Sequence, residues 1–378
     1  MAALLVLCAV SSCRKEEEII PPTNTPVTEG ETGPVAGFFL LNEGNMGSNK
    51  ATLDYFDYET GIYSKNIYPS RNPNVVRELG DVGNDIQIYG SKLYAVINVS
   101  HLVEVMDVAT ARHVATISIP NCRYITFDKG YAYVSSYAGP VAIDPNARLG
   151  YVAKVDTATF RVLDTCVVGY QPEEMIIKDN KLYVANSGGY RKPNYDNTVS
   201  VINLTTFREE KKIVVGINLH RMTLDAYGAI WVSSRGDQYY IPSKTYVLDT
   251  RTDNVSAVLA QLPNSNMALC GDSLYVCSSE WNYPENRYTL AYALVDVKTR
   301  RILAHHFITD DTEQRIERPY GIAVNPETKE IFVTDAKGYI TPGTLYCFTS
   351  DGKKKWEVTT GDIPAHIVFT RQKLTINN

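Results

Sequence analysis

The sequence lacks the features of several large functional classes. Its 37 Lys and Arg residues are outnumbered by 42 Asp and Glu residues, which gives a formal net charge of −5. A nucleic-acid-binding surface needs a clear excess of basic residues, so this balance argues against a nucleic-acid partner. The apolar run at the start covers only residues 1–12, whereas a membrane-spanning helix needs about 20 residues. No stretch of useful length shows the periodicity of an amphipathic helix.

Cysteine pairs and catalytic motifs are also missing. Beyond Cys8 and Cys13, the cysteines are Cys122, Cys166, Cys270, Cys277 and Cys347. An odd set without Cys-x-x-Cys spacing predicts neither a disulfide framework nor a zinc site, although Cys270 and Cys277 could pair across a hairpin. The sequence has no nucleophile-elbow glycines, no His-Glu-x-x-His and no phosphate-binding Gly-rich loop. We therefore expect a binding protein rather than an enzyme, with no resident cofactor or metal.

The start of the chain predicts secretion and lipidation. Residues 1–12 are apolar or small, which is typical of a secretory signal and its cleavage site. Cys13 follows directly, and this arrangement resembles the bacterial lipoprotein pattern, in which the cysteine is lipidated and becomes the mature N-terminus. We predict a signal peptide over 1–12, a lipidated cysteine and flexible linker over 13–36, and one domain over 37–378. The acidic residues 16–18 resemble a surface-export signal of Bacteroidetes lipoproteins; a merely solvated, charged linker is the alternative.

A short apolar strand with an aromatic residue near its middle recurs seven times after the linker. The copies are Phe38–Asn42, Leu93–Val96, Ala132–Ser135, Leu182–Asn186, Ile230–Ser233, Leu274–Cys277 and Ile331–Thr334. An alternating strand follows each copy and ends at Asp or Asn, at positions 57, 107, 156, 203, 249 and 296, with Thr349 in the last copy. A repeat of about 50 residues with four short strands is typical of a β-propeller.

The predicted fold is therefore all-β, a seven-bladed β-propeller with four antiparallel strands (A to D, from the centre outward) in each blade. The chain enters the first blade at strand B, at Gly37, and Ile363–Phe369 matches the strand-A template Arg318–Val324. We expect this C-terminal strand to complete the first blade, because the closed ring then leaves no inner sheet edge exposed. The Asp that ends each strand C is expected to accept hydrogen bonds from the following turn. Trp231 occupies the aromatic position of a strand B and is expected to pack in the core.

These repeats resemble those of the YncE-like propellers. With its lipoprotein leader, the chain resembles the surface lipoproteins of that group, closest to the BtuG family of gut Bacteroidetes. The resemblance implies a surface-exposed protein of the outer membrane that is held there by its lipid anchor. It also implies that the protein binds cobalamin or a related corrinoid as cargo and passes it to the TonB-dependent cobalamin transporter BtuB. The alternatives are a glycan- or protein-binding surface propeller and a propeller lactonase or lyase.

The D-to-A and B-to-C connections of a propeller share one face, where ligands usually bind. Neighbouring blades place unlike polar residues at the start of strand A, and the B-to-C loops add aromatic rings and arginines. This mixture suits a large flat ligand with polar arms. The predicted ligand-binding residues are Asn84, Asp85, Arg123, Tyr124, Tyr137, Glu174, Tyr190, His220, Arg221, Arg235, Tyr239, Trp281, Tyr283, Tyr320, Tyr339 and His366. Trp281 is the strongest single candidate. For an enzyme, Glu173 and Glu174 would be the acid–base pair, and His220 and His366 would titrate near neutral pH.

Overall fold

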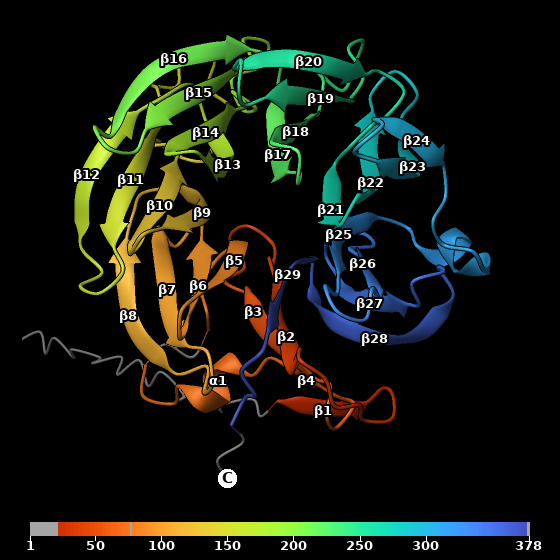
Figure 1. The fold of residues 1–378 in the computed structure, drawn as a ribbon. Coiled ribbons are helices and arrows are strands. Elements are labelled where there is room, and N and C mark those ends of the chain that lie inside the picture. Colours follow the sequence, from red (N-terminus) through yellow and green to blue (C-terminus); the bar gives the residue numbers. More distant parts are fainter. Residues whose placement is uncertain (1–21, 76–77, 376–378) are drawn as a thin grey trace, which may run out of the picture.

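A computed structural model describes residues 22–75 and 78–375 and shows a ring of seven β-sheets around a central channel (Figure 1). Six sheets have four antiparallel strands and the first has five. The predicted seven-bladed β-propeller is thereby confirmed. The signal peptide, the acidic cluster and the lipidation of Cys13 were predicted for residues outside the described part of the chain. None of the helices in the described part has the length and apolar character needed to cross a bilayer.

Blade 1 combines strands from both ends of the described chain, and blades 2 to 4 follow chain order. Blade 1 contains β1 (Thr23–Pro26), β2 (Gly37–Asn42), β3 (Thr52–Asp57), β4 (Ile62–Lys65) and β29 (Pro364–Thr370). Blade 2 contains β5 (Gly83–Tyr89), β6 (Lys92–Ile97), β7 (Leu102–Asp107) and β8 (His113–Ser118). Blade 3 contains β9 (Cys122–Asp128), β10 (Tyr131–Ser136), β11 (Tyr151–Asp156) and β12 (Val162–Val167). Blade 4 contains β13 (Pro172–Lys178), β14 (Lys181–Asn186), β15 (Thr198–Asn203) and β16 (Arg208–Val214).

The remaining blades repeat this plan. Blade 5 contains β17 (Leu219–Leu224), β18 (Ala229–Ser234), β19 (Lys244–Asp249) and β20 (Asn254–Leu259). Blade 6 contains β21 (Asn266–Cys270), β22 (Ser273–Asn282), β23 (Arg287–Asp296) and β24 (Arg301–Ala304). Blade 7 contains β25 (Pro319–Val324), β26 (Ile331–Asp335), β27 (Pro342–Phe348) and β28 (Lys354–Asp362). A short helix α1 (Tyr68–Arg71) and a 3₁₀ helix η1 (Asp311–Arg315) lie between blades.

Both ends of the described chain belong to blade 1. The C-terminal strand β29 pairs antiparallel with β2 and supplies the innermost strand, as predicted from the sequence. At the outer edge, β1 pairs with β4, so four residues of the segment expected to be a linker form a fifth strand. The residues after β29 also have a place, which the sequence did not suggest: Leu374 is buried in the core cluster between blades 1 and 2. Both ends of the described chain therefore help to close the ring at blade 1.

Apolar clusters fill the spaces between neighbouring blades. Trp231 is fully buried against Leu274 and Val276 of the next blade, which confirms its role in packing. Its Nε1 donates to a carboxylate oxygen of Asp225 at 3.0 Å, so the buried indole N–H is satisfied. Cys270 and Cys277 carry free thiols, so the hairpin disulfide considered from the sequence is not formed.

The polar residue that ends each strand C fixes the turn after it, as predicted. In blades 1 to 6 its side-chain oxygen accepts a backbone N–H of the next few residues, at 2.8 to 3.1 Å. In blade 7 the hydroxyl of Thr349 accepts the N–H of Lys353 at 3.0 Å. The repeated turn holds strands C and D together on the face opposite the B-to-C loops.

Candidate functional site

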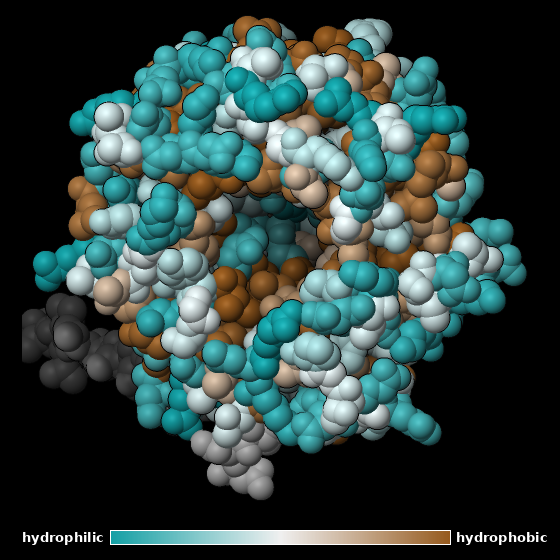
Figure 2. All heavy atoms as spheres, viewed as in Figure 1, coloured by the Kyte–Doolittle hydropathy of each residue, from teal (hydrophilic) through white to brown (hydrophobic). Residues whose placement is uncertain are grey.

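A cavity of about 410 Å³ lies at the centre of the ring, on the face formed by the D-to-A and B-to-C connections. Viewed along the central axis of the ring, the molecule is hollowed at its centre, where hydrophilic and hydrophobic residues meet (Figure 2). The structure brings eight of the predicted residues together as lining of this central cavity. They are Asn84, Arg123, Tyr124, Tyr190, His220, Arg221, Arg235 and Tyr320.

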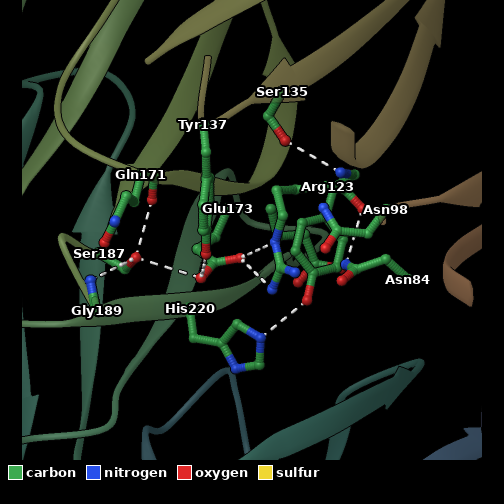
Figure 3. Close-up of polar contacts among 12 residues, drawn as sticks. Asn84, Asn98, Arg123, Ser135, Tyr137, Gln171, Glu173, Ser187, Gly189 and His220 are labelled. Carbon is green, nitrogen blue, oxygen red and sulfur yellow. Dashed lines mark hydrogen bonds and ion pairs between the residues drawn. The ribbon is translucent and has the colours of Figure 1, made fainter. Parts of the chain in front are cut away.

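Glu173 is the hub of the polar network beside the cavity (Figure 3). It is the second residue of strand A of blade 4, and its side chain is only 1% exposed. Arg123 of blade 3 donates to one carboxylate oxygen through Nε and a terminal nitrogen, both at 3.2 Å. The other oxygen accepts from Arg235 of blade 5 at 2.8 Å, from the hydroxyl of Ser187 at 3.2 Å and from the hydroxyl of Tyr137. One carboxylate thus orients donors from three blades.

The hydrogen-bond and ion-pair partners of Glu173 keep its carboxyl group ionised. Burial alone would raise the pKa of its carboxyl, but the guanidinium groups of Arg123 and Arg235 outweigh this effect and hold the pKa below its usual range. Arg123 lies 4.8 Å from the centre of the Tyr137 ring, which adds a cation–π contact. Tyr137 itself is buried and does not line the cavity, so this predicted ligand-binding residue instead supports Glu173.

His220, Tyr124 and Arg221 form a second group on the cavity wall. His220 Nε2 lies 2.8 Å from the hydroxyl of Tyr124, and the guanidinium of Arg221 lies 5.1 Å from the Tyr124 ring. Burial, together with the nearby guanidinium groups, lowers the pKa of His220 well below its usual value, so the imidazole is neutral. His220 Nδ1, Arg221 Nε and Arg235 Nε have no hydrogen-bond partner within the described residues. The hydrogen-bonding capacity of the wall is therefore not used up by the chain itself.

Several predicted residues tie neighbouring strands A together. Asp85 accepts the N–H of Ile125 at 3.0 Å, across the boundary between blades 2 and 3. Glu174 accepts the N–H of Met222 at 2.6 Å, across the boundary between blades 4 and 5. Asn84 lines the cavity but also donates to the carbonyl of Arg123 at 2.8 Å. Asp85 and Glu174 lie outside the cavity lining, so the variation among the strand-A positions is in part a structural device that holds the ring together.

Glu174 is expected to make stability depend on pH. Burial raises the pKa of its carboxyl to about 7, although Arg221 opposes the shift. The folded protein therefore keeps a proton that the unfolded chain releases, and the free energy of unfolding falls as pH rises from about 4.5 to about 7. Gln stays neutral and can still accept the Met222 N–H. At each pH, the free energy of unfolding of Glu174→Gln is compared with that of the wild type. This difference should favour the variant more at pH 8 than at pH 5, by about 1 to 3 kcal/mol. Urea unfolding at both pH values measures this difference, and an equal effect at both would contradict it.

Glu43 links two predicted residues at the opposite wall. Its carboxylate accepts from the hydroxyl of Tyr320 at 2.9 Å and lies 3.3 Å from Nε2 of His366. His366 is 8% exposed and does not line the cavity itself, but it contacts Glu43, which does. Tyr320 lines the cavity, so Glu43 positions it there.

A series of aromatic rings rises from the cavity towards the rim of blades 5 to 7. Tyr320 contacts Tyr339, which contacts Tyr288, with ring centres 5.9 and 6.4 Å apart. Tyr288 lies edge-on to Trp281 at 5.0 Å. Trp281 is perpendicular to Tyr283, and Tyr283 stacks on Tyr239 with the rings 4.5 Å apart and nearly parallel. The predicted Tyr239, Trp281, Tyr283 and Tyr339 thus belong to an aromatic wall that adjoins the cavity at Tyr320, and they do not line the cavity themselves.

Sequence reasoning missed several residues of this site. Of the neighbouring pair Glu173 and Glu174, only Glu174 was chosen as a ligand-binding residue, whereas Glu173 holds the arginines. Glu43 and Gln238 lie in B-to-C loops and Tyr288 lies in the extended part of β23, so none of them occupies a position that the repeat would reveal. Alternation along the strand does not supply the signal either, because both members of Arg123/Tyr124 and of His220/Arg221 line the cavity, whereas neither Glu173 nor Glu174 does.

No metal site is evident in residues 22–75 and 78–375, where no group of three or more His, Cys, Asp or Glu side chains is placed to hold an ion. The candidate site is thus a polar cavity with fixed arginines, neutral histidine and an aromatic wall. Such a site can hold carbonyl, carboxylate or phosphate oxygens while flat groups lie against the rings.

Solved structures of similar shape share the fold at low sequence identity. A functionally unknown protein from Desulfotomaculum acetoxidans has a TM-score of 0.61 at 12% identity, over 89% of this chain and 99% of that one. A quinoprotein alcohol dehydrogenase-like protein from Bacteroides thetaiotaomicron has a TM-score of 0.58 at 14% identity, over 90% and 79%. Hydrazine synthase of Kuenenia stuttgartiensis has a TM-score of 0.55 at 15% identity, over 71% and 77%. At these identities the likeness shows the fold alone.

Sequence comparison places the chain in a family. No curated protein sequence matches it. A family model described as "Domain of unknown function (DUF5074)" matches residues 36–370, from the end of the predicted linker to the last strand of the ring. Since this span covers nearly the whole propeller, the chain belongs to the DUF5074 family.

Proposed function

We propose that the protein binds a corrinoid such as cobalamin at the central cavity and that it is not an enzyme. The observation that carries this proposal is the pairing of two surfaces: a cavity wall with arginines fixed by Glu173, and a continuous series of aromatic rings next to it. A corrinoid combines a flat macrocycle with amide arms around its edge. The amide oxygens would accept from the guanidinium groups while the macrocycle lies against the rings.

The size of the site supports partial rather than full enclosure. A corrinoid is much larger than the 410 Å³ cavity, so only its polar arms would enter while the macrocycle rests on the rim. Open access from the loop face would suit a protein that gives its cargo to a partner. In this proposal the partner is a TonB-dependent transporter, and a lipid on Cys13 would hold the propeller at the outer membrane beside it.

Titration of the purified protein with cyanocobalamin tests the proposal. We expect saturable binding, seen as released heat and a change in visible absorption, and a higher melting temperature in the presence of ligand. Arg235→Ala should weaken binding about tenfold to hundredfold, because a charged hydrogen-bond donor is lost at the cavity. Arg251→Ala is the matched control, since Arg251 lies in the C-to-D turn of the same blade, on the opposite face.

Other outcomes would identify other functions. Absence of cyanocobalamin binding together with binding to an oligosaccharide array would replace the corrinoid with a glycan. Hydrolysis of a lactone that is lost in Glu174→Gln would make the protein an enzyme. Either result would contradict the proposal.

A further inference from the structure

The hairpin formed by strands B and C of blade 6 projects beyond the corresponding hairpins of the other blades. Strand β22 has ten residues, whereas strand B has five or six in every other blade. Its partner β23 also has ten, and the added part of the ladder pairs Glu280 with Thr289, Trp281 with Tyr288 and Asn282 with Arg287. The extension places Trp281 beyond the level at which the other strands B end.

This extension forms one side of a second hollow, here called the hairpin cleft. The cleft has a volume of about 410 Å³ and lies between the extended hairpin and the B-to-C loop of blade 5. Its lining includes Gln238, Tyr240, Glu280, Trp281 and Asn282. Trp281 is partly exposed and Tyr240 is 87% exposed, so two rings are available to a flat group that enters between loop and hairpin.

Arg235 separates the hairpin cleft from the central cavity, because it lines both. Its terminal nitrogen is held on Glu173 at 2.8 Å, while about a third of the side chain (32%) remains exposed. Gln238 also lines both hollows. A single ligand with two parts can therefore occupy both hollows, with a fixed guanidinium between the parts.

We infer that the hairpin cleft is a second subsite for the same ligand, one that takes the nucleotide arm of a complete corrinoid. The inference rests on the proposed function. The arm ends in a flat aromatic base, which stacks on tyrosine and tryptophan rings, and the corrin with its amide arms stays over the central cavity. The protein would therefore distinguish complete cobalamin from cobinamide, which has the same corrin and amide arms but no nucleotide arm.

Two ligands and three variants test this inference by calorimetry. The wild type should bind cyanocobalamin at least about tenfold more tightly than dicyanocobinamide, because stacking of one base is lost. Trp281→Ala should weaken cyanocobalamin binding by a similar factor and change dicyanocobinamide binding less than about twofold. Trp281→Phe keeps a ring and should recover part of the loss. Arg221→Ala, in the central cavity, should weaken the binding of both ligands.

The outcomes separate the two proposals. If the wild type binds neither ligand, the proposed function fails. If it binds both with equal affinity, or if Trp281→Ala weakens both equally, the corrinoid function stands and the subsite inference is overturned. If the wild type prefers cyanocobalamin but Trp281→Ala leaves that preference intact, the arm is recognised elsewhere and the inference is again overturned.

Discussion

Glu173→Ala is expected to lower the free energy of unfolding by about 3 to 5 kcal/mol. The carboxylate is buried and accepts from two guanidinium groups and two hydroxyl groups. Its removal leaves the charge of Arg123 buried without a partner, and this uncompensated burial is the main cost. Urea unfolding followed by tryptophan fluorescence measures the change.

Two further variants make this prediction specific. Glu173→Gln keeps the shape but loses the charge, so it should be destabilised less than Glu173→Ala. Glu285→Ala removes an exposed carboxylate paired with Arg287, and its effect should stay within about 0.5 kcal/mol. A loss for Glu173→Ala no larger than that of Glu285→Ala would mean that the network does not hold the three blades.

Arg221→Met is expected to separate binding from stability. Arg221 is 7% exposed, and its nearest carboxylate oxygen, on Glu174, is 3.9 Å away, so the folded state buries a cation without a close ion pair. Replacing such a cation with an apolar side chain of similar length removes a desolvation cost. At pH 6, where Glu174 is mostly protonated, we expect the free energy of unfolding to fall by no more than about 1 kcal/mol.

The same substitution should weaken cyanocobalamin binding about 30-fold to 100-fold, because the wall then lacks a buried cation that donates hydrogen bonds to the amide oxygens. Arg251→Met, on the opposite face, should change neither quantity. A variant that unfolds as readily as Glu173→Ala, or one that binds as tightly as the wild type, would assign Arg221 to the structure rather than to recognition.

The repeat made the fold predictable from the sequence. Each strand B has an aromatic residue in a run of apolar ones, and each strand C ends at a residue that fixes its turn, so blade number and strand order follow from spacing. The match between Ile363–Phe369 and Arg318–Val324 was sufficient to predict the closing strand. Strand β1 carries no such signal, since Thr-Asn-Thr-Pro is polar and pairs only through its backbone with the edge of blade 1.

The site was only partly predictable, because the role of each of its residues depends on distances between blades. Alignment located the strand-A positions, and eight predicted residues line one cavity. It did not reveal that Asp85 and Glu174 bind the next strand A, since that depends on how closely the blades approach at the axis. The part played by Glu173 is set by Arg123 of blade 3 and Arg235 of blade 5, which lie 50 residues before it and 62 residues after it in the chain.

The position of β29 also constrains the order in which the molecule can assemble. A ribosome makes β2 at the beginning of the propeller and its inner neighbour almost at the end, so blades 2 to 7 have all been synthesised before blade 1 can be finished. A chain that ends prematurely before Pro364 would leave the fully buried strand β2 with a free edge. Such a fragment is expected to associate with other chains through that edge, so faithful completion of translation matters more here than in a fold whose first elements are self-contained.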